Sequence, residues 1–164
     1  MKRANKLILI LLSVFSITTA NAQEIKKWKV QDLEAAIKNA DKPTIINFWA
    51  TFCKPCIEEL PYFQETAKKY DSAGVQLILV SLDLPQAYPK KISAFAAKNK
   101  IKAPIVFLDE TNADLFCPRV DPNWSGAIPA SLFINNKTGY KKFFEDRLSK
   151  EQVEKEIISM INSK

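Results

Sequence analysis

Apolar residues along this chain form two kinds of pattern that alternate from one end to the other. Short apolar runs of strand length are separated by stretches in which apolar residues recur every three or four positions, as on one face of a helix. The strand-like runs cover residues 44–50, 75–81, 104–108 and 131–134. The helix-like stretches cover residues 30–40 and 89–99, together with a longer one that begins at Cys53.

The C-terminal part of the chain predicts a hairpin followed by one more helix. Residues 135–139 read Asn-Asn-Lys-Thr-Gly, a turn between the run at 131–134 and a strand at 140–144. Ser149 and Gln152 have the spacing of a capping box that opens the last helix. Strands that alternate with helices and end in a hairpin predict an α/β sandwich of one domain, with a central mixed sheet flanked by helices.

The first 22 residues have the three-part layout of a secretory signal peptide. Basic residues precede an apolar run at residues 7–17, and an A-x-A cleavage pattern ends at Ala22. The alternative is an uncleaved membrane anchor, for which the apolar run is short. We therefore expect a signal peptide at residues 1–22 and a mature domain at residues 23–164. Its expected location is periplasmic or otherwise extracytoplasmic, where disulfides persist.

Composition restricts the chemistry more than charge does. The chain of 164 residues has a formal net charge of +6 and contains no histidine. The lack of histidine excludes Ser–His and Cys–His catalytic couples and histidine metal sites. The lysines are spread among acidic residues, which favours a solvated surface over a nucleic-acid patch.

The sequence Cys53-Lys54-Pro55-Cys56 lies where a predicted strand gives way to a helix. Free backbone N–H groups and the helix dipole stabilise a thiolate there, and lower a cysteine pKa from about 8.5 to about 3.5–7.5. Two cysteines with this spacing lie about one helical turn apart, close enough to form a disulfide. We expect Cys53, in the exposed first turn, to attack and Cys56 to resolve the mixed disulfide. Lys54 adds positive charge, and Pro55 stiffens the turn.

Two other interpretations of the cysteine pair are weaker. A zinc site needs about four ligands, and only Cys117 is left to join the pair. A purely structural disulfide is seldom a Cys-x-x-Cys at a strand–helix junction. Cys117 itself is expected to be a buried, inert thiol, with a third redox cysteine or an intermolecular bridge as the alternative. We expect neither a metal nor a cofactor.

The residues around the cysteines resemble the thioredoxin superfamily. Residues 48–56, Phe-Trp-Ala-Thr-Phe-Cys-Lys-Pro-Cys, look like its signature, and Glu-Glu-Leu-Pro at 58–61 with the signal peptide is similar to the exported TlpA/ResA-like branch. The resemblance covers residues 27–164 and implies a thioredoxin-like sandwich. Pro61 matches a proline that kinks this helix in the family, and residues 82–111 resemble an extra segment of the exported members.

Two positions depart from the family pattern. Cytosolic members bury an aspartate in the strand before the motif, where this chain has Asn47, which cannot titrate. The resemblance to the exported branch implies that Glu59, three residues after Cys56, serves instead; the alternative is an exposed carboxylate like Glu58. Phe52 replaces the tryptophan common before the first cysteine, a change that concerns substrate contacts and not the sulfur chemistry.

A loop at residues 124–129 ends in Ile128-Pro129 and precedes a predicted strand. A residue before proline is extended, and an extended Ile128 can pair its backbone with a substrate segment. The resemblance implies a cis bond here, with Pro129 facing the cysteine pair; the alternative is an ordinary proline at the start of a strand. Trp124 is expected in the core and not on a contact surface.

The resemblance implies an exported thiol–disulfide oxidoreductase that reduces disulfides of extracytoplasmic proteins, apocytochromes c during maturation among them. A membrane electron donor is then expected to re-reduce it.

An oxidase or isomerase is the alternative in the same class, because sequence does not set the reduction potential. A peroxidase of the peroxiredoxin kind lacks its motif, since Ala50 stands where that motif has threonine before Cys53. A non-catalytic binding module is expected to have lost one cysteine. We expect a monomer that binds no nucleic acid.

Overall fold

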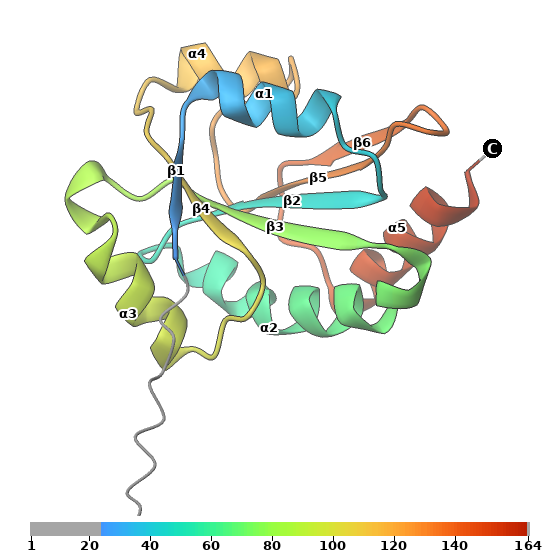
Figure 1. Ribbon diagram of the computed structural model, residues 1–164, viewed down its shortest axis with the longest axis horizontal. Helices are drawn as coiled ribbons and strands as arrows, with labels where there is room; N and C mark the ends of the chain where they lie inside the picture. The colour runs from blue at the N-terminus through green and yellow to red at the C-terminus, as the bar shows by residue number, and fades with distance from the viewer. Residues whose placement is uncertain (1–23, 164) are drawn as a thin grey trace, which may run out of the picture.

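Six strands form one mixed sheet through the middle of the molecule (Figure 1). The structure is a computed structural model and describes residues 24–163. The strands are β1 (Lys26–Trp28), β2 (Thr44–Trp49), β3 (Gln76–Ser81), β4 (Ile105–Leu108), β5 (Ala130–Asn135) and β6 (Tyr140–Phe144). Their order across the sheet is β1-β4-β3-β2-β5-β6, with β1 to β4 parallel and β5 and β6 antiparallel to their neighbours.

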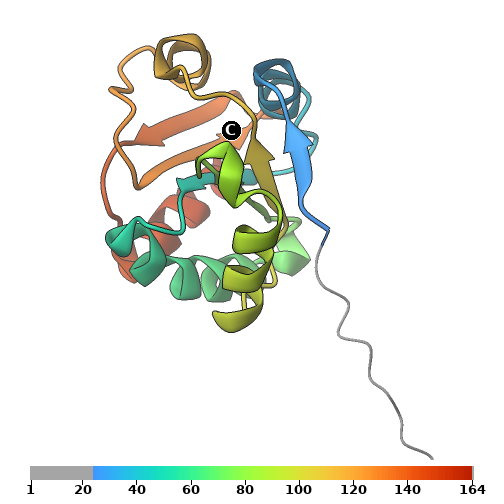
Figure 2. The same cartoon turned by 90° about the vertical axis from the view of Figure 1, so that its left-hand side faces the viewer.

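Helices cover both faces of the sheet. They are α1 (Val30–Lys38), α2 (Lys54–Lys69), α3 (Lys90–Lys98), α4 (Ala113–Val120) and α5 (Lys150–Asn162). Two short 3-10 helices, η1 (Asp71–Ala73) and η2 (Pro85–Ala87), lie in the connections. Helices α2, α3 and α5 lie on one face, and α1 and α4 lie on the other (Figures 1 and 2). The predicted α/β sandwich with a central mixed sheet is confirmed.

The central strand β2 separates two apolar clusters. Ile45 and Trp49 belong to the cluster beneath α2, α3 and α5, whereas Ile46 and Phe48 belong to the cluster beneath α1 and α4. This alternation follows from the two-residue period of a strand, and all six residues of β2 are buried. Asn47 shares the face of Ile45 and Trp49, so its amide lies in the interior below α2.

The predicted helices and strands are all present, with bounds that differ by one or two residues. The capping box of α5 is confirmed, since Ser149 Oγ accepts from the backbone N–H of Gln152, and the Gln152 side chain accepts from the backbone N–H of Ser149. Besides the two 3-10 helices, one strand and one α-helix were not predicted. Strand β1 has only three residues, two of them lysines, and α4 contains Pro118 in its interior, where proline normally ends a helix.

Two predictions concern the relation of the chain to a membrane. The signal-peptide prediction for residues 1–22 lies outside the described residues. Within residues 24–163, none of the helices has the length and apolar character that crossing a bilayer requires.

Candidate active site

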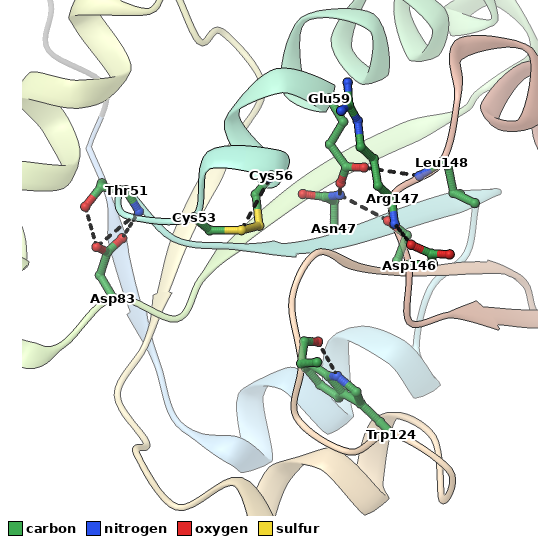
Figure 3. The surroundings of a disulfide bond; sticks show 12 residues. Asn47, Thr51, Cys53, Cys56, Glu59, Asp83, Trp124, Asp146, Arg147 and Leu148 are labelled. Carbon is green, nitrogen blue, oxygen red and sulfur yellow. Dashed lines mark hydrogen bonds between the residues drawn. A yellow bond between two sulfur atoms is a disulfide. The ribbon is translucent and has the colours of Figure 1, made fainter.

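Cys53 and Cys56 form a disulfide where β2 leads into α2 (Figure 3). Cys53 is the N-cap residue of α2, and its Sγ accepts a hydrogen bond of 3.3 Å from the backbone N–H of Cys56. The prediction of an exposed Cys53 is wrong, because Cys53 is only 7% exposed and Cys56 is 0% exposed. The reason is that the Cys53 side chain turns back over the first turn of α2. Cys53 is still the more accessible of the two, and Lys54 and Pro55 beside it are exposed.

Glu59 lies on the buried side of α2, one turn after Cys56. Its exposed fraction is 0%, which contradicts the alternative of a solvated helix carboxylate. Glu59 Oε1 accepts a hydrogen bond of 2.7 Å from Asn47 Nδ2, and Oε2 accepts one of 3.4 Å from the backbone N–H of Leu148 (Figure 3). Glu58, its neighbour in sequence, is exposed and forms an ion pair of 2.7 Å with Arg147.

Burial raises the pKa of Glu59 from its ordinary value of 4.5 to about 7. The hydrogen bonds from Asn47 and Leu148 and the positive charge of Arg147 act in the opposite direction and lower the pKa, while Asp146 raises it. Desolvation outweighs the favourable contacts. The carboxyl group therefore exchanges its proton near neutral pH, as a proton acceptor for a thiol must.

Asn47 holds this carboxyl group in place from the sheet. Its Nδ2 also donates a hydrogen bond of 3.0 Å to Ser131 Oγ on β5, and the two residues lie directly opposite each other in the β2–β5 ladder. Ser131, Arg147 and Leu148 were missed by sequence reasoning. They lie 84 to 89 positions from the residues that they contact, and nothing in the local pattern connects them with the cysteines.

The Ile128–Pro129 bond is cis, as predicted. Ala130 follows Pro129 and pairs with Phe48 in β2, so the proline lies at the edge of the sheet from which the Cys53 loop emerges. Trp124 is 5% exposed, which confirms its place in the core, and its Nε1 donates to the carbonyl oxygen of Ala127 at 2.9 Å. A second cis bond, Tyr88–Pro89, was not predicted.

The connection after β6 holds the loop that leads to the cis-proline. Glu145 accepts hydrogen bonds from the backbone N–H and the hydroxyl of Ser125 and from the backbone N–H of Ala127. These bonds lower the pKa of Glu145, which keeps the carboxylate charged and the loop anchored. The same connection supplies Arg147 and Leu148 beside Glu59, so it contacts both sides of the candidate site.

A carboxylate that sequence reasoning missed lies on the other side of the cysteines. Asp83 follows β3, is 3% exposed and accepts hydrogen bonds from Thr51, two residues before Cys53 (Figure 3). Its only signal in the sequence is an acidic residue two positions after the end of a strand.

Cys117 is a free, buried thiol in α4, as expected for an inert cysteine. Burial raises its pKa to about 11, so the reactive thiolate is scarce at neutral pH. Over residues 24–163, no three or more Cys, Asp or Glu side chains come together in a way that suits a metal ion.

Comparison with known proteins connects this geometry to a family. A family model described as AhpC/TSA matches residues 14–139. The chain belongs to the AhpC/TSA family.

Among curated relatives of this AhpC/TSA member, the thiol-disulfide oxidoreductase ResA of Geobacillus kaustophilus is 29% identical over 119 residues, which cover 73% of the chain and 63% of the relative. The sporulation thiol-disulfide oxidoreductase A of Bacillus subtilis is 28% identical over 113 residues, with coverages of 69% and 65%. The chain thus spans less than two thirds of these relatives.

Solved structures similar to this AhpC/TSA member share its fold. StoA from Bacillus subtilis superposes with a TM-score of 0.55 at 28% identity and covers 73% of this chain and 85% of its own. A thioredoxin family protein from Chlorobium tepidum gives a TM-score of 0.62 at 21% identity, with coverages of 79% and 85%. The thioredoxin-like fold predicted by resemblance is confirmed, and so is the similarity to the ResA branch.

Proposed function

We propose that this AhpC/TSA family member is an exported thiol–disulfide oxidoreductase that reduces disulfides in extracytoplasmic proteins. The observation that carries the proposal is the Cys53–Cys56 disulfide at the N-terminus of α2, one helical turn from the buried Glu59. The printed names of the ResA and sporulation relatives, both thiol-disulfide oxidoreductases, support it.

The first step is attack by the reduced form of the protein. The Cys53 thiolate attacks one sulfur of a substrate disulfide, that disulfide bond breaks, and the other substrate sulfur leaves as a thiolate that takes up a proton. The product is a mixed disulfide between Cys53 and the substrate. The N-cap position of Cys53 favours this thiolate, because the backbone N–H of Cys56 points at Sγ.

The second step releases the substrate. Glu59 takes the proton of the Cys56 thiol, directly or through a water, and the Cys56 thiolate attacks the Cys53 sulfur. The mixed disulfide breaks, the second substrate sulfur leaves as a thiolate that takes up the proton from Glu59, and Cys53–Cys56 closes as the disulfide seen in the structure. The substrate has then gained two electrons, and a membrane dithiol donor must return two electrons to the protein before the next cycle.

Four residues are proposed to contact the substrate. Lys54 and Pro55 are exposed on the outer side of the disulfide. Ile128 is partly buried and Pro129 buried at the adjoining edge of the sheet, where the backbone of Ile128 is proposed to pair with an extended substrate segment. Proteins with exposed disulfides suit such a site, and oxidised apocytochromes c are proposed among them.

Two properties of the whole protein belong to the same proposal. Export is supported by the signal-peptide layout of residues 1–22, and a structurally similar protein from Mycobacterium tuberculosis is described as a secreted disulfide oxidoreductase. The protein is proposed to act as a monomer. A peroxidase remains the weaker alternative because Ala50 replaces the threonine of that motif.

Trapping of mixed disulfides tests the proposed division of labour. In a Cys117→Ser background, the reduced Cys56→Ser variant is mixed with an oxidised protein that has one disulfide, and products are separated on non-reducing gels. We expect a mixed disulfide through Cys53 to accumulate, because no resolving thiol is present. Cys53→Ser is the matched control and should trap almost none. Equal trapping by both variants contradicts the assignment.

A further inference from the structure

We propose that Asp83 is a positioning residue that fixes the loop before Cys53 and thereby the place of the attacking sulfur. This inference rests on the proposed function, in which Cys53 is the attacking thiol. Asp83 lies at the end of β3, outside the Cys-x-x-Cys motif, and is separated from Thr51 by 32 positions in the sequence.

The Asp83 carboxylate accepts hydrogen bonds from both donors of Thr51. Oδ2 accepts from the Thr51 backbone N–H at 3.0 Å, and Oδ1 accepts from the same group at 3.2 Å and from Thr51 Oγ1 at 2.5 Å. Oδ2 also accepts from Ser81 Oγ at 2.8 Å, and Ser81 Oγ accepts from the Asp83 backbone N–H at 3.2 Å. Both oxygens thus have donors, which offsets the cost of burying the carboxylate.

The ends of this loop, Ala50 and Cys53, are packed in the apolar core, but its middle is not. Phe52, next to Cys53, is 65% exposed, and Leu84, next to Asp83, is 61% exposed. Two backbone hydrogen bonds also hold the loop, from the Leu82 N–H to the Trp49 carbonyl oxygen at 2.8 Å and from the Cys53 N–H to the Ala50 carbonyl oxygen at 3.0 Å. The hydrogen bonds from Thr51 to Asp83 lie between these two and connect Thr51 to the segment that follows β3.

The position of Cys53 Sγ depends on this attachment. In the reduced protein the thiolate is stabilised only while Sγ stays at the N-cap of α2, within reach of the Cys56 N–H. A loop that comes away from β3 lets Cys53 leave that place, which raises its pKa. The negative charge of Asp83 also raises this pKa, so a test must separate the hydrogen bonds from the charge.

A pair of substitutions makes this separation. Asp83→Asn and Asp83→Ala both remove the charge, but the asparagine Oδ1 still accepts from Thr51 while its Nδ2 donates to Ser81 Oγ. Reduced proteins are alkylated with iodoacetamide across the pH range, and the modified cysteine is identified by peptide mass mapping. Lys54 and Glu59 are unchanged in both variants. We expect the Cys53 pKa in Asp83→Ala to exceed that in Asp83→Asn by about one unit, which is about tenfold less thiolate below that pKa.

Identical Cys53 profiles in the two variants overturn the proposal. Circular dichroism shows whether Asp83→Ala folds, and if it does not, Thr51→Val and Thr51→Ser replace the pair. Valine has the shape of threonine without its hydroxyl, and serine keeps the hydroxyl. We then expect the valine variant to have the higher Cys53 pKa, and equal profiles again overturn the proposal.

Failure of the positioning role and failure of the proposed function give different results. If Cys53 is alkylated fastest but equally in all variants, only the role of Asp83 is refuted. If Cys56 or Cys117 is alkylated before Cys53 in the unsubstituted protein, the attacking thiol has been assigned wrongly, and the positioning proposal is refuted together with it.

Discussion

Glu59 differs from the other carboxylates of α2 in the side of the helix on which it lies. The side chains of Glu58 and Glu65 are 41% and 68% exposed and pair with Arg147 and Lys150, whereas Glu59 is buried beneath the helix. Folding raises the pKa of Glu59 from 4.5 to about 7. Between these two pH values the folded protein holds a proton on Glu59 that the unfolded chain has lost. The free energy of unfolding therefore falls as the pH rises through this range.

Replacement of Glu59 by glutamine should remove this loss of stability at rising pH. Glutamine keeps the shape and an acceptor for Asn47 but carries no charge. We expect Glu59→Gln and the parent, both oxidised, to have nearly equal free energies of unfolding near pH 4. Near pH 8 the variant should be more stable, by up to about 3 kcal/mol. Urea unfolding at several pH values measures this.

The matched control is Glu58→Gln, on the exposed side of the same helix turn. Its ion pair with Arg147 is solvated, and such a pair contributes about 0–1 kcal/mol. A stability difference between Glu59→Gln and the parent that does not change with pH would show that Glu59 titrates normally.

At the scale of elements, the connection between β6 and α5 joins the parts of the candidate site. Glu145 holds the loop before the cis-proline, Arg147 pairs with Glu58, and Leu148 donates to Glu59. The Leu148 carbonyl oxygen also accepts from Tyr62 Oη on α2 at 2.5 Å. This connection therefore sets the charge environment of Glu59 from outside its own helix.

Arg147→Met should move the pH dependence of substrate release. The variant removes a positive charge that lowers the Glu59 pKa and leaves Glu58 unpaired, and both changes favour protonated Glu59. We expect the pH midpoint for resolution of the mixed disulfide to rise by about half a unit, because the guanidinium is partly solvated. Stopped-flow measurement of substrate thiol release across the pH range tests this.

Arg119→Met provides the matched control. The Arg119 side chain is 48% exposed, as is that of Arg147, and pairs with Glu34 at 2.8 Å on the opposite face of the sheet. This variant should keep the parental midpoint. Equal midpoints in all three proteins would mean that Arg147 has no influence on Glu59.

On the scale of the whole molecule, the sheet order determines where the site lies. β2 is central, parallel to β3 and antiparallel to β5, so the Cys53 loop, Asp83 and the cis-proline meet at one edge of the sheet. Helix α2 then begins at that edge and covers the face from which Asn47 points. The described residues form this whole arrangement without the predicted signal peptide.

Export of the full chain should therefore yield a protein that begins at Gln23. Intact mass spectrometry of the periplasmic fraction, after expression with the native N-terminus, measures the cleavage site. Ala22→Arg is the control, because a large charged residue at the cleavage position should block processing. A full-length chain retained in the membrane fraction would contradict the predicted cleavage.

The sequence by itself determined the features that depend on neighbours along the chain. The local patterns predicted the strands other than β1 and the α-helices other than α4, and the capping box and the Cys-x-x-Cys at a strand–helix junction followed from local spacing. Resemblance to a family added the cis bond before Pro129. Where local rules conflicted with the structure, as at Pro118 inside α4 and in the lysine-rich β1, the sequence was misleading because packing against neighbouring elements outweighs local propensity.

Only the tertiary structure decided the environments of the polar groups. Glu58 and Glu59 are identical neighbours in the sequence, yet one is solvated and the other has a pKa of about 7, because desolvation depends on what packs above each carboxylate. The partners Asn47 and Leu148 of Glu59 lie 12 and 89 positions away, and the partner Thr51 of Asp83 lies 32 positions away. Hydrogen bonds across such separations form only once the sheet order brings the chain segments together. No local sequence pattern therefore predicts them.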